Sequence, residues 1–339
     1  MKTKYLAVLA LLSSSLLAAC GGGSDSATGP TSSTATKVSI TSSNQSTITN
    51  AALQSATQNL AGNNLSHVGG VQISANAEND RVLSKWADFA FGKIAEHQST
   101  PLSVSGAVIS TSACTTSGNI TFDTDGTPTT VYTYFTISFN NCVENGTTTN
   151  GTLSLSNLAI TYNSTRTAAT DISAKYNFDL TSSNASFTTG IYGGFDIAAT
   201  GIATPTRINS ISGTSLNFKV NSKYVTLSNF AFTTSYDNTI PDHGYSDTVH
   251  YTIASDVILA GFDFRTNTAL VRNYLDLYPC SGQFEITGAN LTKLKATVDD
   301  TDANKGTSSG HVLLRLSQDN GVNYGTTVSK TWAQLAAGQ

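Results

Sequence analysis

The stretch Leu155-Ser156-Asn157-Leu158-Ala159-Ile160 decides the fold, because it recurs as Leu227-Ser228-Asn229-Phe230-Ala231-Phe232. Looser copies begin at Tyr192 and Leu259, so the starts at 155, 192, 227 and 259 lie 37, 35 and 32 residues apart. Such a period has room for two strands and their turns. Each repeat is therefore interpreted as one hairpin of a repetitive structure.

The apolar positions change phase inside the first copy. Leu153 and Leu155 have one parity, whereas Leu158 and Ile160 have the other. Side chains alternate between the two faces of a strand, and one extra residue restores their direction after such a slip. We therefore expect β-bulges at similar points of successive hairpins, and these would curl the sheet.

From Leu102 onward the chain alternates between strand and turn patterns. Apolar and polar residues alternate with period two over 131–139 and 216–220, which indicates antiparallel strands with one buried face. The sequence predicts a mainly β protein with one large, curled antiparallel sheet, an open or half barrel. A β-sandwich or a solenoid is the alternative.

Two helices are expected before the sheet. The first covers Ser46 to Leu60, and the second covers about Asn76 to His97. The second carries a wide apolar stripe at helical spacing, made of Leu83, Trp86, Ala87, Ala90 and Ile94. Such a stripe needs a large apolar surface, so we expect this helix to pack on the apolar side of the sheet.

The N-terminus has the pattern of a secretory signal: two lysines, then an apolar run too short to span a bilayer. The residues Leu17-Ala18-Ala19-Cys20 resemble the lipobox of bacterial lipoproteins. That resemblance implies cleavage before Cys20, lipid on its sulfur and acylation of the new α-amino group. Gly21 in place of Asp is similar to the pattern of outer-membrane sorting. A plain signal peptide with a chance cysteine is the alternative.

Four segments follow from these patterns. Residues 1–19 are the signal peptide, and 20–45 are the lipidated cysteine with a flexible Gly/Ser/Thr-rich tether. Residues 46–100 form the helical segment, and 101–339 form the β body, in one domain with the helices. We expect a lipid-anchored protein of the outer membrane, with its periplasmic or surface side left open.

The composition argues against a nucleic-acid partner. Charged residues make up 12% of the chain, about half of the usual ~25%, and the net charge is −4. No basic run follows the signal, so neither nucleic acid nor an acidic membrane surface is an expected partner.

The cysteines predict one disulfide. With Cys20 lipidated, Cys114, Cys142 and Cys280 remain in an oxidising compartment. Cys114 and Cys142 flank a hairpin turn at 123–128, so they should lie nearly opposite each other on paired strands. Closing their loop contributes roughly 3–4 kcal/mol. Cys280 is then odd, either buried and inert or paired with another molecule.

A calcium-like pattern occurs at Asp300, Asp302 and Asn304. An EF-hand loop continues with Gly at its sixth position and Glu at its twelfth, where this chain has Lys305 and His311. A solvated turn is the main interpretation, and a weak calcium site is the alternative.

His243 and His250 lie near two aspartates and are candidate zinc ligands. Asp247 and His250 would nevertheless point to opposite faces if the strand has begun. Residues 306–310 have the form G-x-S-x-G but lack the strand–turn–helix context of a nucleophile elbow. We therefore expect neither a catalytic site nor a cofactor.

The stretch from Tyr278 to Asn290 resembles a signature of uncharacterised proteobacterial outer-membrane lipoproteins with repetitive β-sheet bodies. Asp319-Asn320-Gly321 and Thr331-Trp332-Ala333-Gln334-Leu335 are similar to that group as well. The chain departs from its D-x-D-G turn, because Gln318 precedes Asp319. The resemblance implies an envelope lipoprotein and brings no activity.

These patterns favour a non-enzymatic, membrane-anchored binding or structural module. Its expected partners are the membrane, through lipid on Cys20, and an envelope protein or apolar ligand. A carrier holding lipid in a curled-sheet cavity is the second hypothesis. A metal-dependent enzyme using the His243–His250 loop is the third.

Overall fold

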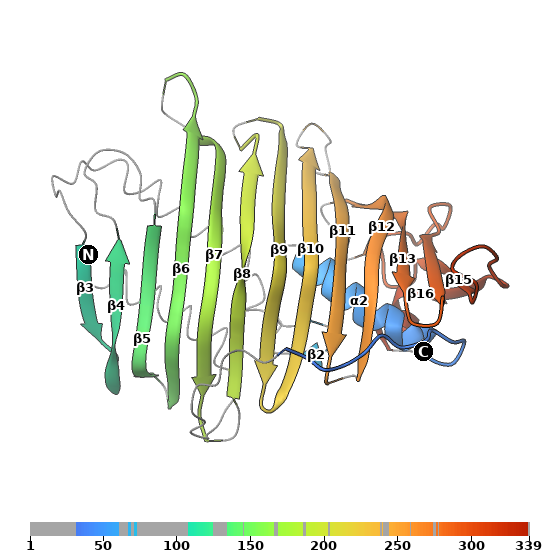
Figure 1. Cartoon of the computed structure of the whole chain (residues 1–339). Helices are drawn as coiled ribbons and strands as arrows, with labels where there is room; N and C mark the ends of the chain where they lie inside the picture. Colours follow the sequence, from blue (N-terminus) through green and yellow to red (C-terminus); the bar gives the residue numbers. More distant parts are fainter. Residues whose placement is uncertain are drawn as a thin grey trace.

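A single antiparallel sheet of fourteen strands organises the described part of the chain (Figure 1). The computed structural model describes residues 32–60, 67–68, 71–72, 108–124, 134–144, 146–165, 169–185, 188–202, 204–237, 239, 244–257, 259–273, 276 and 278–337. Every strand pairs with its neighbours in chain order, so the sheet is an uninterrupted meander with β3 and β16 at its edges.

The strands of the sheet are longest in its middle. Their bounds are β3 (Val108–Ala113), β4 (Ser117–Thr124), β5 (Tyr134–Glu144), β6 (Thr147–Tyr162), β7 (Ala169–Ser183), β8 (Thr188–Thr200), β9 (Thr206–Val220), β10 (Lys223–Asp237), β11 (Gly244–Ser255), β12 (Ala260–Arg272), β13 (Ser281–Thr287), β14 (Lys293–Val298), β15 (His311–Ser317) and β16 (Val328–Thr331). The predicted mainly β class and the open, curled antiparallel sheet are confirmed. Neither a sandwich nor a solenoid is needed to describe these strands.

The predicted bulges occur at both close copies of the repeat. The pairing of β6 with β7 shifts between Ser156 and Ala159, and that of β10 with β11 shifts between Ser228 and Ala231. Asn157 and Asn229 lie at these shifts with φ of 53° and 47°. Asn tolerates this left-handed conformation better than most residues. The extra residue turns the next apolar side chain back to the buried face, so Leu158 and Phe230 are both buried.

The fourth copy does not form a bulge, contrary to the sequence prediction. Gly261 and Phe262 pair without a shift with Ala254 and Ile253 of β11. The other edge of Gly261 is occupied by the N-terminal segment, since its N–H donates to the Thr36 carbonyl and its carbonyl accepts from Val38 N. Backbone pairing on both edges keeps this part of β12 regular.

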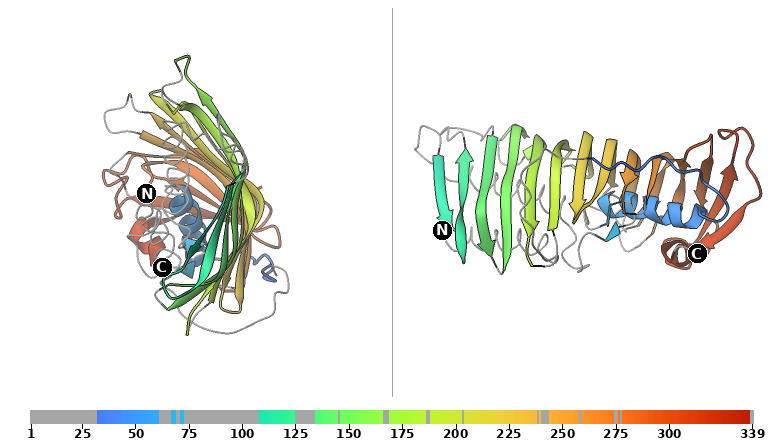
Figure 2. Two further views of the ribbon diagram at one scale, coloured as in Figure 1. Left: turned by 90° about the vertical axis from the view of Figure 1, so that its left-hand side faces the viewer. Right: turned by 60° about the horizontal axis from the view of Figure 1, so that its bottom comes forward.

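The sheet has an inner and an outer face, and Figure 2 shows it curling around helix α2 (Gln45–Leu60) on the inner side. The alternating burial of β11 places Val249, Tyr251 and Ile253 on the inner face. The Tyr251 hydroxyl donates to the Ala52 carbonyl of α2 at 2.6 Å. The inner face is therefore the core, and the outer face carries the polar half of each strand.

Residues 33–40 form a strap along one rim of the sheet, which corrects the predicted tether over 20–45. Asp256 accepts hydrogen bonds from Ser33 Oγ at 2.7 Å and Thr34 N at 2.9 Å. Lys37 forms an ion pair with Asp263, and Ile40 is fully buried. The Ser/Thr-rich composition suggested a free linker, but these polar side chains find fixed partners and Ile40 enters the core.

The expected first helix is confirmed as α2. The predicted helical segment 46–100 also contains an unexpected two-stranded ladder, β1 (His67–Val68) with β2 (Val71–Gln72). The expected second helix, with Trp86, lies outside the described residues, so its packing stays a prediction. A short helix, α4 (Trp332–Ala336), ends the described chain. In the parts that the structure describes, no helix has the length and apolar character needed to cross a membrane.

Candidate functional site

A shallow hollow of about 770 Å³ lies in the middle of the sheet, across β7 to β11. Phe195 and Phe230 are buried, whereas Lys175, Asp196 and His250 are exposed, so the hollow opens on the outer face. The residues that line it are Lys175, Asn177, Phe178, Gly193, Gly194, Phe195, Asp196, Ser212, Gly213, Thr214, Ser215, Asn229, Phe230, Ala231 and His250.

The register of the strands places five lining residues in one row across the sheet. Lys175 of β7 faces Asp196 of β8, which faces Ser212 of β9. Ser212 in turn faces Ala231 of β10, and Ala231 faces His250 of β11. Each residue stands on the outer face of its own strand, so the row has large side chains at its ends and small ones at its centre.

A β-bulge of β9 and Gly213 shape the floor of the hollow. The pairing of β8 with β9 shifts between Gly194 and Asp196, so two residues of β9 oppose one of β8. A Cβ on Gly213 would lie 2.5 Å from Phe230 Cζ and 2.8 Å from the Gly194 carbonyl oxygen. Only glycine therefore lets the Phe230 ring and β8 approach β9 this closely.

Most polar side chains of the hollow have no protein partner, although the Ser215 hydroxyl accepts a hydrogen bond from Asn217 Nδ2 at 3.5 Å. Within the described part of the chain, no hydrogen bond or ion pair is made by the side chains of Lys175, Asn177, Asp196, Ser212, Thr214, Asn229 and His250. Next to the hollow, some polar side chains of the outer face are hydrogen-bonded to each other. Thr181 and Tyr192 are hydrogen-bonded at 2.8 Å, and Thr226 donates to Asn217 at 2.7 Å. These seven side chains are therefore free to bond to water or to a ligand in the hollow.

The donors and acceptors of the hollow suit an uncharged polar ligand. Lys175 offers only donors and Asp196 only acceptors, while Asn177 and Asn229 offer both. One ammonium and one carboxylate balance each other. The hollow falls within the volume range of small-molecule sites, about 300–1,000 Å³, but it is open and polar, so we expect weak binding.

A second polar cluster is structural. Asp247 lies on the inner face, 3% exposed, and accepts from Thr234 Oγ1 at 2.8 Å and from Arg272 Nε at 3.3 Å. Burial raises the pKa of the Asp247 carboxyl, although Arg272 and Thr234 oppose that rise. The Arg272 guanidinium also lies 4.7 Å from the Tyr245 ring centroid. Each side chain of this cluster contacts another member of it. The cluster therefore has a structural role, where β10, β11 and β12 lie side by side.

The candidate ligand groups of the calcium-like loop are hydrogen-bonded within the protein. Asp302 accepts from the backbone N–H of Asn304 and from both the backbone and the Nδ1 of His311. These bonds, first that from Asn304, lower the pKa of Asp302. The Asp300 carbonyl accepts from Lys305 Nζ. In the described residues, no three His, Cys, Asp or Glu side chains gather as a metal site.

Of the two candidate zinc ligands, only His250 lies within the described residues. His250 is exposed on the outer face, and Asp247 is buried on the inner face, as the alternation along β11 predicted. His243 lies outside the described residues. His250 instead belongs to the hollow, a role that the sequence reasoning missed.

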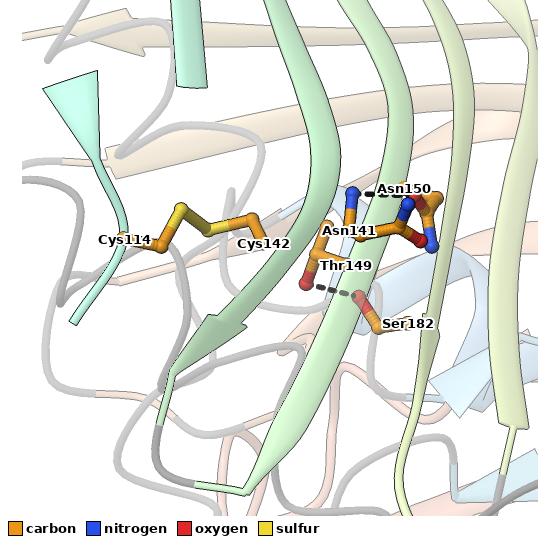
Figure 3. Close-up of a disulfide and its surroundings, with 6 residues drawn as sticks. All are labelled: Cys114, Asn141, Cys142, Thr149, Asn150 and Ser182. Atoms are coloured by element: carbon orange, nitrogen blue, oxygen red, sulfur yellow. Dashed lines mark hydrogen bonds between the residues drawn. A yellow bond between two sulfur atoms is a disulfide. The ribbon is translucent and has the colours of Figure 1, made fainter. Parts of the chain in front are cut away.

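The predicted disulfide is present. Cys114 and Cys142 are bonded with Cα atoms 5.5 Å apart, as Figure 3 shows. They do not lie on paired strands, which corrects the expected geometry: Cys114 follows β3, Cys142 lies on β5, and β4 runs between them. Asn141 N beside Cys142 donates to Asn150 Oδ1 at 2.7 Å (Figure 3), so the bridge is set in a hydrogen-bonded part of the sheet.

The other two cysteines of the chain are Cys280 and Cys20. Cys280 is free and half-buried, and its thiol donates to the Val271 carbonyl at 3.2 Å. Burial, then the negative charge of Asp276, raises the pKa of this thiol, which makes it a weak nucleophile. Cys20, the expected lipidation site, lies outside the described residues.

Comparison with known proteins gives no relative. The chain matches no family model, no curated protein and no solved structure.

Proposed function

We propose that this protein is a lipid-anchored component of the bacterial outer membrane that acts as a non-enzymatic binding module. Cys20 carries the anchor, and the outer face of the sheet binds the partner. The observation that supports this proposal best is the contrast between the faces: the inner face is filled, while the outer face has an open hollow with unpartnered polar side chains.

The filled inner face weighs against a carrier of apolar ligands. Beneath α2, the rings of Tyr251, Phe264 and Phe284 form a continuous stack with centroid distances of 5.2 Å. All three side chains are at most 2% exposed. Ala52 of α2 is fully buried and its carbonyl accepts from the Tyr251 hydroxyl, so α2 packs directly on this part of the sheet.

The strap supports an anchored arrangement. It begins on the outer face, where Ser33 N donates to Thr226 Oγ1 at 2.8 Å. From Thr226 to Ala231 of the hollow is five residues of β10, or about 17 Å at ~3.3 Å per residue. The run of about 12 residues from Cys20 to the strap, taken as the linker that its Gly/Ser/Thr-rich composition predicts, adds on the order of 20 Å. An anchor on Cys20 would thus hold the hollow close to the membrane surface.

Anchoring is tested by metabolic labelling with radioactive palmitate, followed by separation of inner and outer membranes. The wild-type chain should carry label and sediment with the outer membrane. Cys20→Ala should lose the label and the membrane association, while the control Cys280→Ala should keep both. An unlabelled wild-type chain in the soluble fraction would contradict the proposal.

Binding is tested by adding the Cys20→Ala chain to washed outer-membrane and cell-wall fractions and measuring co-sedimentation. We expect saturable retention on at least one fraction. A chain that stays in the supernatant with both fractions would refute the binding module, whatever the labelling result.

A further inference from the structure

We propose that the hollow on the outer face is a binding site for a neutral oligosaccharide. This inference deepens the proposed binding function by naming its ligand class. The starting observation is an open hollow in which seven polar side chains lack a hydrogen-bond or ion-pair partner among the described residues.

The mixture of groups matches sugar hydroxyls. A hydroxyl both donates and accepts, so it can bond simultaneously to an acceptor such as Asp196 and a donor such as Lys175. The amides of Asn177 and Asn229 serve either role on opposite sides of the hollow. Gly194 and Gly213 have no side chain and Ala231 has only a methyl group, so these residues leave a low floor on which the C–H face of a sugar ring would rest.

Other ligand classes fit less well. An extended peptide binds by adding a strand to a sheet edge, but β8 to β10 are central strands whose backbone groups already pair on both sides. A polyanion would meet the carboxylate of Asp196, next to Ser212 at the centre of the row. An apolar molecule would leave the charged and amide groups of the walls without water or a partner.

The experiment uses the full chain purified from membranes in an amine-oxide detergent, since a maltoside detergent would itself supply a saccharide. Maltotriose and tri-N-acetylchitotriose are titrated separately, with saturation-transfer difference NMR and calorimetry as readouts. For an open polar site we expect a Kd on the order of 1 mM for at least one of them. Preference for one trisaccharide would distinguish a glucan from an N-acetylated amino-sugar polymer as the natural source.

Two matched pairs of variants locate the binding. Ser212→Tyr places a ring in the hollow and should weaken binding at least about tenfold. Ser210→Tyr, two residues along the same face of β9 and outside the hollow, should leave it unchanged. Asp196→Ala removes an acceptor without added bulk and should also weaken binding, whereas Asp179→Ala on β7 should not. The second pair decides the question if Ser212→Tyr fails to fold.

Absence of binding by either trisaccharide at about ten times the expected Kd would overturn the inference. Equal binding by Asp196→Ala and Asp179→Ala would overturn it as well. In either case, retention of the chain on envelope fractions would leave the proposed binding module standing, so the two ideas fail separately.

Discussion

The inner and outer faces of this sheet are built from the same strands but behave differently. On the inner face, aromatic rings stack in sequence from Tyr251 through Phe264 to Phe284, and α2 covers them. On the outer face, pairs such as Thr181 with Tyr192 and Thr226 with Asn217 hydrogen-bond across strands, and an open hollow contains seven polar side chains without a partner among the described residues. Stability therefore resides on the inner face, and recognition is assigned to the outer face.

The test with the largest expected effect compares two neighbouring residues of β12, one on each face of the sheet. Phe264→Ala removes a ring that is 1% exposed and should lower the free energy of unfolding by about 3–5 kcal/mol. Arg265→Ala, on the outer face, should change it by less than about 0.5 kcal/mol. Urea unfolding followed by circular dichroism measures both. Similar losses for the two variants would break the contrast.

The second test concerns the edge of the sheet farthest from α2 in strand order. The Cys114–Cys142 bridge closes a loop with a sequence separation of 28. Replacing both cysteines with Ser should cost roughly 3–4 kcal/mol, chiefly by freeing the unfolded chain. The cost should appear in urea unfolding of the double variant, with Cys280→Ser as the control. A loss below about 1 kcal/mol would show that β3 to β5 hold without the covalent tie.

The third test addresses the rim, where the strap passes from the outer to the inner face. A Cβ on Gly288 would lie 2.4 Å from the Val38 carbonyl oxygen, which is backbone and cannot turn away. Gly288→Ala should therefore push the strap off the rim and cost about 1–3 kcal/mol. Hydrogen exchange should become faster at Ala289, whose N–H donates to the Val38 carbonyl, and at Val38, whose N–H donates to the Gly261 carbonyl. Unchanged exchange there would contradict the strap.

The smallest effect is a pH dependence of the same strap. Burial raises the pKa of Asp256, but hydrogen bonds from Ser33, Thr34, Tyr224 and Ala35 outweigh it and hold the pKa below 3.8. A carboxyl with a lowered folded pKa stabilises the fold above its unfolded pKa, and this contribution disappears as pH falls through the folded value. Exchange at the N–H of Ala35 should thus accelerate, relative to its intrinsic rate, as pH drops below about 4. Asp256→Asn should remove that step, and an unchanged step would assign it to another group.

The sequence predicted those parts of the fold that depend on local pattern. The phase slip between Leu155 and Leu158 identified the bulge at Asn157, and the repeat extended that prediction to the copy with Asn229. The disulfide partners were predicted correctly, but the turn between Cys114 and Ser117 was not recognised, so the intervening β4 was missed. The Ser/Thr composition of 33–37 hid a strap, although Val38 and Ile40 gave an apolar signal.

The candidate site was not predictable in this way. Asp196, Ser212, Ala231 and His250 are ordinary polar or small residues on four different strands. They form a hollow only because register aligns them and the bulge of β9 lowers the floor between them. Which polar side chains lack a partner depends on the side chains of neighbouring strands, so the site has no signature in the sequence.

The most direct test of the contrast between the faces is native mass spectrometry of the full chain released from membranes under mild conditions. A filled inner face predicts a mass equal to the processed chain with its covalent acyl groups, and no retained apolar molecule. A stoichiometric lipid or other apolar ligand that survives transfer to the gas phase would contradict this account. It would assign binding to the inner face instead.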